Sequence, residues 1–152
     1  MAESCLVMPG EGLASVVGEV LCWPPESFRY DMRESELRER VNKMDVAGRM
    51  RHLVWGPYVV LPAGCWRARV RLAFDQWSCR QEFYFEFGSA KDFVRQAFTP
   101  GREGLYEITA DATWSRPVKA EARVVMIESS VGGMFEFLGA SVEFCGDAVG
   151  AP

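Results

Sequence analysis

The chain is poor in the residues on which most catalytic and metal sites depend. Its 152 residues include a single histidine, His52, and a single asparagine, Asn42. A metal enzyme built on a β-sandwich needs two or three histidines with a carboxylate, so the sequence excludes a site of that kind. A serine or cysteine nucleophile could pair only with His52, and no GxSxG motif is present. Since GxGxxG and Walker sequences are also missing, we expect neither a metal nor a cofactor.

The charge and hydropathy patterns disfavour two further classes of protein. The formal net charge is −4, with no long run of one sign, whereas non-specific nucleic-acid binding requires a basic surface. No apolar run approaches the ~20 residues of a membrane span. The first residues contain Glu3 and no basic cluster, unlike a secretory signal. We therefore expect a cytoplasmic protein that binds no nucleic acid and does not span a membrane.

The cysteines do not form a recognisable metal or redox motif. There are five, widely spaced, and no CxxC sequence occurs. This pattern disfavours zinc and dithiol sites. In a reducing cytoplasm the simplest expectation is free thiols, and a disulfide framework is the alternative.

What the chain does contain is strict two-residue alternation of apolar and polar side chains. The clearest case is the segment 65–75, which is typical of a half-buried β-strand. The same alternation returns in 80–88, 104–114, 118–128 and 134–144, where it places Leu138 inward, and it is blurred in 13–22. Segment 52–61 is a strand or extended segment interrupted at Gly56-Pro57, and 91–98 is a short strand or a turn of helix. Seven or eight short strands at this spacing predict an all-β fold, a two-sheet antiparallel β-sandwich of jelly-roll-like type. We expect one such domain over residues 1–152.

The polar face of segment 65–75 carries a row of arginines, Arg67, Arg69 and Arg71. We expect this strand and 80–88 to form an antiparallel hairpin, which would place the arginines beside Glu82, Tyr84 and Glu86. The row is then a cross-strand ladder of arginine and glutamate. A binding patch for phosphate is the alternative.

Segment 26–51 differs from the rest of the chain because it holds much of the charge. Asp31 and Glu34 have the spacing of a capping box, and Leu37, Val41 and Met44 follow at helical spacing. The pattern predicts one short peripheral helix near residues 33–44 within a charged insertion. A long charged loop is the alternative.

Several aromatic residues lie where no core is expected. Trp55 and Tyr58 flank Gly56-Pro57, and Trp77 lies at the predicted hairpin tip. Aromatic rings stack on the apolar faces of sugars, and neighbouring polar groups bind the hydroxyls. The candidate ligand-binding residues are Trp55, Tyr58 and Trp77, with His52, Gln76 and Arg80 as polar partners. The alternative is that these rings pack at the edge of the core.

Carboxylates for glycoside hydrolysis cannot be paired from sequence alone. Glu107, Asp111, Glu121 and Glu128 are candidates only because any two carboxylates can meet in space. We therefore predict no catalytic residues, and an enzyme is the least favoured hypothesis.

Three segments carry a resemblance to a known group of domains: HLVWGPYVVLPAGCWRA from His52, EARV from Glu121 and FLGASVEF from Phe137. Together they resemble carbohydrate-binding-module-like β-sandwich (jelly-roll) domains associated with bacterial glycosyltransferases and polysaccharide-synthesis proteins. The resemblance covers roughly residues 52–144. In such domains the Pro-Ala-Gly turn and the strand after it are structural. The charged segment 26–51 has no counterpart in them.

This resemblance implies a non-catalytic carbohydrate-binding domain that acts with polysaccharide-synthesis or glycosyltransferase machinery. The expected partners are a sugar or polysaccharide, together with a glycosyltransferase or another protein. The first alternative is a protein-protein interaction module that docks through the predicted helix or an unpaired sheet edge. A small carbohydrate-active enzyme, such as a glycosidase or sugar isomerase, is the second.

Overall fold

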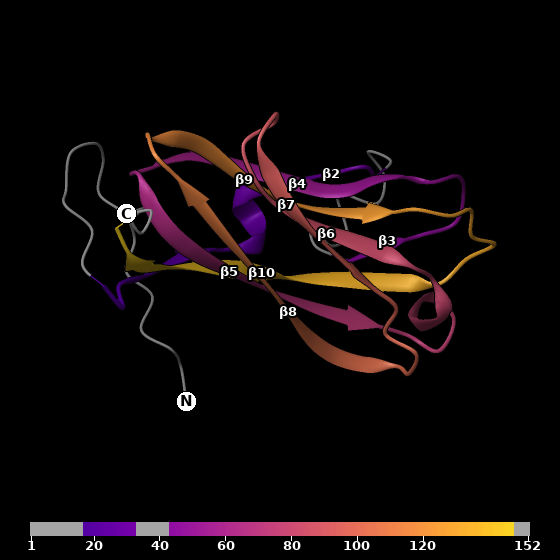
Figure 1. Ribbon diagram of the computed structural model, residues 1–152. Coiled ribbons are helices and arrows are strands. Elements are labelled where there is room, and N and C mark those ends of the chain that lie inside the picture. Colours follow the sequence, from indigo (N-terminus) through magenta and orange to yellow (C-terminus); the bar gives the residue numbers. More distant parts are fainter. Residues whose placement is uncertain (1–16, 33–42, 148–152) are drawn as a thin grey trace.

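The structure is a computed structural model that describes residues 17–32 and 43–147, and it consists of two antiparallel sheets packed face to face (Figure 1). The β5 sheet contains β1 (Val20–Trp23), β10 (Met134–Gly146), β5 (Gly64–Phe74) and β8 (Gly104–Trp114) in that order, and β3 (Lys43–Asp45) also pairs with β10. The β9 sheet contains, in order, β2 (Arg29–Tyr30), β4 (Arg51–Leu61), β9 (Val118–Met126), β6 (Phe83–Gly88) and β7 (Phe93–Phe98). The predicted all-β, two-sheet sandwich is confirmed.

The chain crosses repeatedly between the two sheets, which gives the jelly-roll connectivity. β5 pairs with β8 and β10, whereas β6 pairs with β7 and β9. The predicted hairpin of 65–75 with 80–88 is therefore wrong, because the connection between these strands leads from one sheet to the other. Alternation determines which face of a strand is apolar, but it does not determine which strand lies beside it.

Phenylalanines from both sheets fill the middle of the core. Phe74 of the β5 sheet lies 5.0 Å from Phe83 of the β9 sheet between ring centres, and 5.5 Å from Phe135. All three side chains are at most 4% exposed. Tilted contacts of this kind add to the hydrophobic effect that holds the layers together.

The Pro-Ala-Gly turn anchors two buried tryptophans. The carbonyl oxygen of Pro62 accepts a hydrogen bond from the indole nitrogens of both Trp66 and Trp114, each at 2.9 Å. Gly64 follows at φ +143°, where a Cβ would lie 2.4 Å from the ring of Phe144. The turn therefore needs glycine for space and satisfies two indole donors that burial would otherwise leave unpaired.

The structure departs from the sequence-based expectations in the charged segment and in β10. Most of the predicted helix, residues 33–42, lies outside the described residues, but Lys43 and Met44 belong to strand β3. In β10 the pairing shifts between Phe137 and Ala140, so Phe137 is buried and Leu138 is only half-buried. The inward placement of Leu138 is therefore wrong.

The cysteines follow the expectation only in part. Cys65, Cys79 and Cys145 are free thiols, but Cys22 is disulfide-bonded. Cys5 lies outside the described residues.

None of the helices within the described ranges is long and apolar enough to span a bilayer.

Two glycines of β6 and β8 allow a test of the close packing near the edge of the β9 sheet. Gly88 and Gly104 have nearly the same φ, +146° and +141°, but a Cβ on Gly88 would lie 2.4 Å from the Asp92 carbonyl oxygen, whereas Gly104 has no neighbour within 4 Å. Both alanine variants carry a backbone cost of about 1–3 kcal/mol. We expect Gly88→Ala to lower the free energy of unfolding by about 1–3 kcal/mol more than Gly104→Ala, measured by urea denaturation. Equal losses would contradict this packing.

Candidate functional site

A continuous row of polar and aromatic side chains crosses the outer face of the β9 sheet. The strand register places one residue from each of the five strands side by side in this row. In order from β2 to β7, they are Arg29, Trp55, Arg123, Glu86 and Arg95. Their neighbours along β9, Ala122 and Val124, are buried in the core, so the row lies on the face directed away from it.

Arg123 joins two carboxylates in the middle of this row. Its Nη1 donates to Glu121 Oε1 at 2.5 Å, and its Nε lies 2.9 Å from Glu86 Oε1 without hydrogen-bond alignment. Glu86 also accepts a hydrogen bond from Arg95 Nε at 2.8 Å. The Arg123 guanidinium lies over the ring of Phe93, 4.3 Å from its centre. Glu86 and Glu121 are thereby only 3% and 4% exposed, although they point away from the core.

The second oxygen of Glu121 is left without an aligned donor. Its Oε2 is buried and has no hydrogen-bond partner among the described residues. Glu121 forms part of the wall of an open pocket of about 350 Å³, together with His52, Trp55, Tyr58 and Arg123. A buried acceptor without a donor costs about 1–3 kcal/mol, and such groups are uncommon in folded proteins. This pocket therefore holds an acceptor that a bound ligand could satisfy.

Tyr58 reaches the same pocket from an unusual backbone conformation. It is the one non-glycine residue of the described chain with a positive φ, +66°, and it lies where the β4–β9 pairing is irregular. Non-glycine residues seldom adopt this conformation, and it recurs at functional sites. Burial, then a side-chain hydrogen bond to Glu121, and then the charge of that carboxylate raise the pKa of Tyr58, while Arg29 and Arg123 lower it. The hydroxyl is protonated at neutral pH, as a tyrosine normally is, and can donate to Glu121 or to a ligand beside it.

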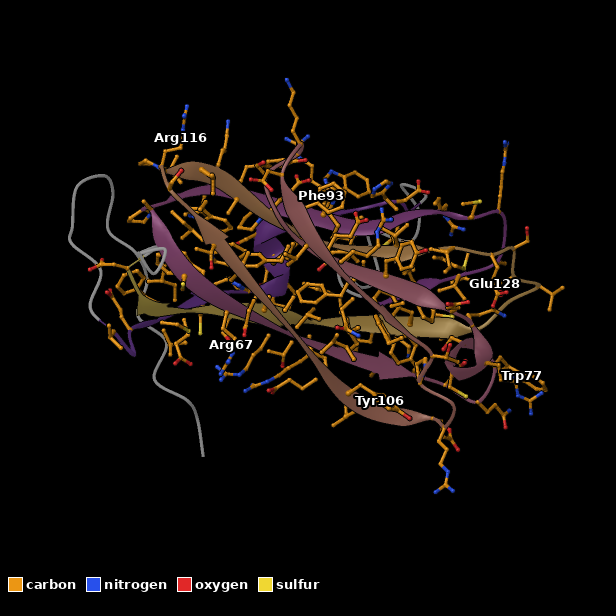
Figure 2. All side chains as sticks on the ribbon, in the orientation of Figure 1. Arg67, Trp77, Phe93, Tyr106, Arg116 and Glu128 are labelled. Carbon is orange, nitrogen blue, oxygen red and sulfur yellow. The ribbon has the colours of Figure 1, made fainter. Side chains whose placement is uncertain are left out.

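The six residues predicted from sequence do not form one group. His52, Trp55 and Tyr58 lie together in the β4 part of the pocket. Gln76, Trp77 and Arg80 lie on the connection between β5 and β6 and do not line it. Trp77 is 57% exposed and projects from the end of the sandwich (Figure 2), with the Arg80 guanidinium 5.9 Å from its ring centre.

Sequence reasoning missed the roles of Glu121 and Arg123. In the sequence, Glu121 is one of several carboxylates without an evident partner, and Arg123 is one of the polar residues that alternate with apolar ones in segment 118–128. The available signal was a glutamate and an arginine two positions apart, which share one face of a strand. Their burial could not be read from that spacing, because it depends on Phe93 and Glu86 from other strands.

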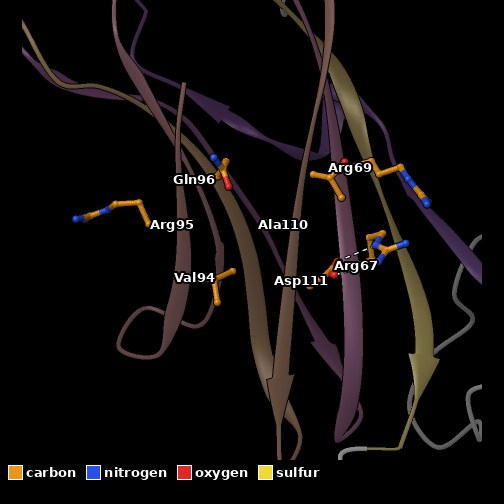
Figure 3. Close-up of a pocket in the computed structure, with 8 residues that line it drawn as sticks. Arg67, Arg69, Val94, Arg95, Gln96, Ala110 and Asp111 are labelled. Carbon is orange, nitrogen blue, oxygen red and sulfur yellow. Dashed lines mark hydrogen bonds and ion pairs between the residues drawn. The ribbon is translucent and has the colours of Figure 1, made fainter. Parts of the chain in front are cut away.

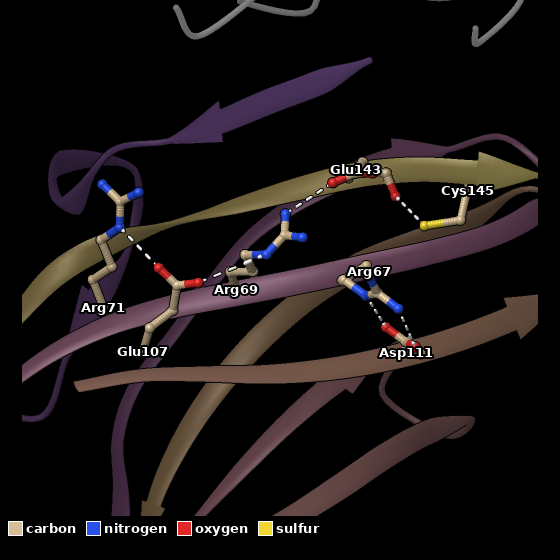
Figure 4. Close-up of polar contacts among 7 residues, drawn as sticks. All are labelled: Arg67, Arg69, Arg71, Glu107, Asp111, Glu143 and Cys145. Carbon is tan, nitrogen blue, oxygen red and sulfur yellow. Dashed lines mark hydrogen bonds and ion pairs between the residues drawn. The ribbon is translucent and has the colours of Figure 1, made fainter. Parts of the chain in front are cut away.

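The arginine row of β5 meets carboxylates from both neighbouring strands (Figure 4). Arg67 donates to Asp111 of β8 at 2.8 and 3.1 Å. Arg69 donates to Glu143 of β10 at 2.9 Å, and Arg71 to Glu107 of β8 at 3.4 Å. Of the residues expected opposite this row, Tyr84 and Glu86 lie in β6 of the other sheet and Glu82 directly precedes it, so their assignment is wrong. The row is nevertheless a ladder of ion pairs, which disfavours a phosphate patch.

A second pocket, of about 410 Å³, lies where the edge strands β7 and β8 approach each other (Figure 3). Val94 and Gln96 turn toward β8, whereas Arg95 turns away. Arg67 and Asp111 form an ion pair in its wall. Among the described residues, no aromatic ring lines this pocket, and it therefore lacks a stacking surface.

Across residues 17–32 and 43–147, no group of three histidine, cysteine, aspartate or glutamate side chains could hold a metal ion.

Comparisons with known proteins do not assign the chain to a family. No family model matches the chain, and no curated protein matches it. Among solved structures, the chain is similar to dimeric latent PorU from Porphyromonas gingivalis, with a TM-score of 0.43 and 9% sequence identity. The match covers 95% of this chain but only 14% of that one. A likeness at this level carries no information about function.

The ion pairs on the two outer faces should differ in their effect on stability. Arg123→Ala would leave the buried Glu121 without a cation and Glu86 with Arg95 alone, and we expect the free energy of unfolding to fall by about 3–5 kcal/mol. Arg67→Ala removes an exposed ion pair, and we expect little change in the urea midpoint. Equal effects of the two substitutions would show that Arg123 has no special structural role.

Proposed function

We propose that this chain is a non-catalytic carbohydrate-binding domain whose ligand lies in the pocket of the β9 sheet. The observation that supports this most strongly is the buried, unpartnered oxygen of Glu121 in the same wall as Trp55 and Tyr58. Small-molecule sites typically combine apolar or aromatic surface with a few well-placed polar groups. This pocket has both within one short stretch of two neighbouring strands.

The pocket matches the chemistry of a sugar ring. Such a ring presents an apolar face of C–H groups, which can stack on Trp55, and an edge of hydroxyls. Glu121 can accept from a hydroxyl, while the protonated Tyr58 can donate to one. Its volume of about 350 Å³ lies near the lower end of the ~300–1,000 Å³ range of ligand sites, which favours one end or a short stretch of a glycan.

A binding role is favoured over catalysis because the pocket wall contains a single carboxylate. Glycoside hydrolysis by the common retaining and inverting routes requires a pair. Glu121, which is that carboxylate, already bonds Arg123 through one oxygen.

We further propose that the domain acts beside polysaccharide-synthesis or glycosyltransferase machinery. This part rests on the resemblance of the segments around His52, Glu121 and Phe137. A cytoplasmic location is supported by the free thiols of Cys65, Cys79 and Cys145. The disulfide at Cys22 counts against it, because disulfides persist mainly in oxidising compartments.

A protein-interaction module is the second candidate function. β8 pairs with β5 on one side and is an edge strand among the described residues, and its Leu105 is 75% exposed. An edge strand of this kind can accept a further strand from a partner. The predicted docking helix near 33–44 lies largely outside the described residues.

The sugar site can be tested with two tryptophan variants. We expect Trp55→Ala to weaken binding of the best ligand in a glycan panel by roughly tenfold or more, because it removes the stacking surface. Trp77→Ala is the matched control, since it also removes an indole but outside the pocket, and it should leave the affinity unchanged. Isothermal titration calorimetry measures both.

Two results would count against this assignment. Loss of binding in Trp77→Ala with full binding in Trp55→Ala would place the site on the β5–β6 connection instead. No binding by the unmodified protein across a panel of neutral, acidic and amino sugars would reject the carbohydrate function.

A further inference from the structure

We infer that the pocket selects neutral sugars with adjacent hydroxyl groups, and that Glu121 is the residue that rejects acidic sugars. This inference rests on the proposed carbohydrate-binding function and concerns the same pocket. It names the chemical class of the ligand and the side chain that sets it.

Glu121 requires a hydrogen-bond donor. Within residues 17–32 and 43–147 its buried Oε2 has no partner, and an ionised carboxylate can only accept hydrogen bonds. A ligand that fills this position must therefore present a donor, such as a hydroxyl. A uronic acid that placed its own carboxylate here would meet a like charge at short range and in a partly desolvated site, where repulsion is strongest.

The cation of the pocket wall, Arg123, already has carboxylate partners in the protein. Arg123 is 11% exposed and is held between Glu121 and Glu86, at 2.5 and 2.9 Å. Glu86 is in turn paired with Arg95, with an Nη2 to Oε2 distance of 2.6 Å. The positive charge in the wall is thus already matched by carboxylates of the protein itself. An anionic ligand could recruit Arg123 only by breaking these ion pairs.

Tyr58 is the donor beside this acceptor. A side-chain hydrogen bond to Glu121 contributes to the raised pKa of Tyr58, after the larger effect of burial, so the hydroxyl lies next to the carboxylate. It does not satisfy Oε2, which keeps no aligned donor among the described residues. Two neighbouring hydroxyls on a sugar ring fit this arrangement, because one can donate to Glu121 while the other accepts from Tyr58.

Arg29 is the residue that could favour an acidic sugar over a neutral one. It lies beside Trp55 in the outer row, is exposed, and lowers the pKa of Tyr58. It is not part of the pocket wall, so a ligand seated against Glu121 would reach it only from the rim. The experiment therefore includes an Arg29 variant.

The test uses sugar pairs that differ at C6, where the acid has a carboxylate in place of the hydroxymethyl group: glucose with glucuronic acid, galactose with galacturonic acid, and mannose with mannuronic acid, each as short oligosaccharides. Calorimetry gives the affinity ratio within a pair. We expect the unmodified protein to bind the neutral member at least tenfold more tightly. Glu121→Gln keeps an acceptor for Arg123 and supplies an amide donor in place of the charge, so the ratio should fall at least tenfold, mainly through tighter binding of the acid.

Glu107→Gln is the matched control, because Glu107 pairs with arginines on the outer face of the other sheet. It should leave the ratio unchanged, and urea unfolding of each variant confirms that the sandwich is intact. An unchanged ratio in a folded Glu121→Gln protein would overturn the role of Glu121. Preference of the unmodified protein for the acid, lost in Arg29→Ala, would overturn the proposed ligand class. Binding of amino sugars but of neither member of any pair would also overturn the ligand class. Binding of no sugar at all would overturn the carbohydrate function itself, and this inference with it.

Discussion

The central position of β9 in its sheet determines how the charged side chains on the outer face of that sheet are buried and paired. Strands lie on both sides of it, so side chains at Glu121 and Arg123 are covered by their neighbours and cannot extend freely into water. Charges in such a place have to be paired, and they are paired in alternating sign from Glu121 through Arg123 and Glu86 to Arg95. This chain of charges ends at Glu121, whose second oxygen has no aligned donor in the part of the chain that the structure describes.

The layered architecture could be predicted from sequence because alternation reports which side of each strand is apolar. It could not reveal neighbours, and the expected pairing of β5 with β6 failed because the connection through Trp77 changes sheets. Alternation also fails where an extra residue enters a strand. The irregular pairing after Phe137 moves Leu138 off the inner face, although the sequence there shows no break in its apolar character.

The residues of the candidate site are also of two kinds, those that the sequence groups together and those that only strand pairing brings together. His52, Trp55 and Tyr58 could be grouped from sequence because they belong to one strand and one short motif. Glu121 and Arg123 come from a strand more than sixty positions further along, and only the β4–β9 register brings them to the same pocket. Trp77 shares with this group only that it is an aromatic residue without an expected place in the core. It lies on the connection between β5 and β6, away from the pocket.

The sharing of one carbonyl by two indoles has a practical consequence for spectroscopy. Trp66 and Trp114 bond Pro62 inside the sandwich, and Trp23 is also buried. Of the five tryptophans, a dissolved quencher such as iodide would then reach only Trp55 and Trp77. The quenchable part of the intrinsic emission thus comes from two separate surfaces. In a Trp77→Ala variant, Trp55 would be the one tryptophan that the quencher reaches. Its emission would then report on the pocket alone, with no added dye.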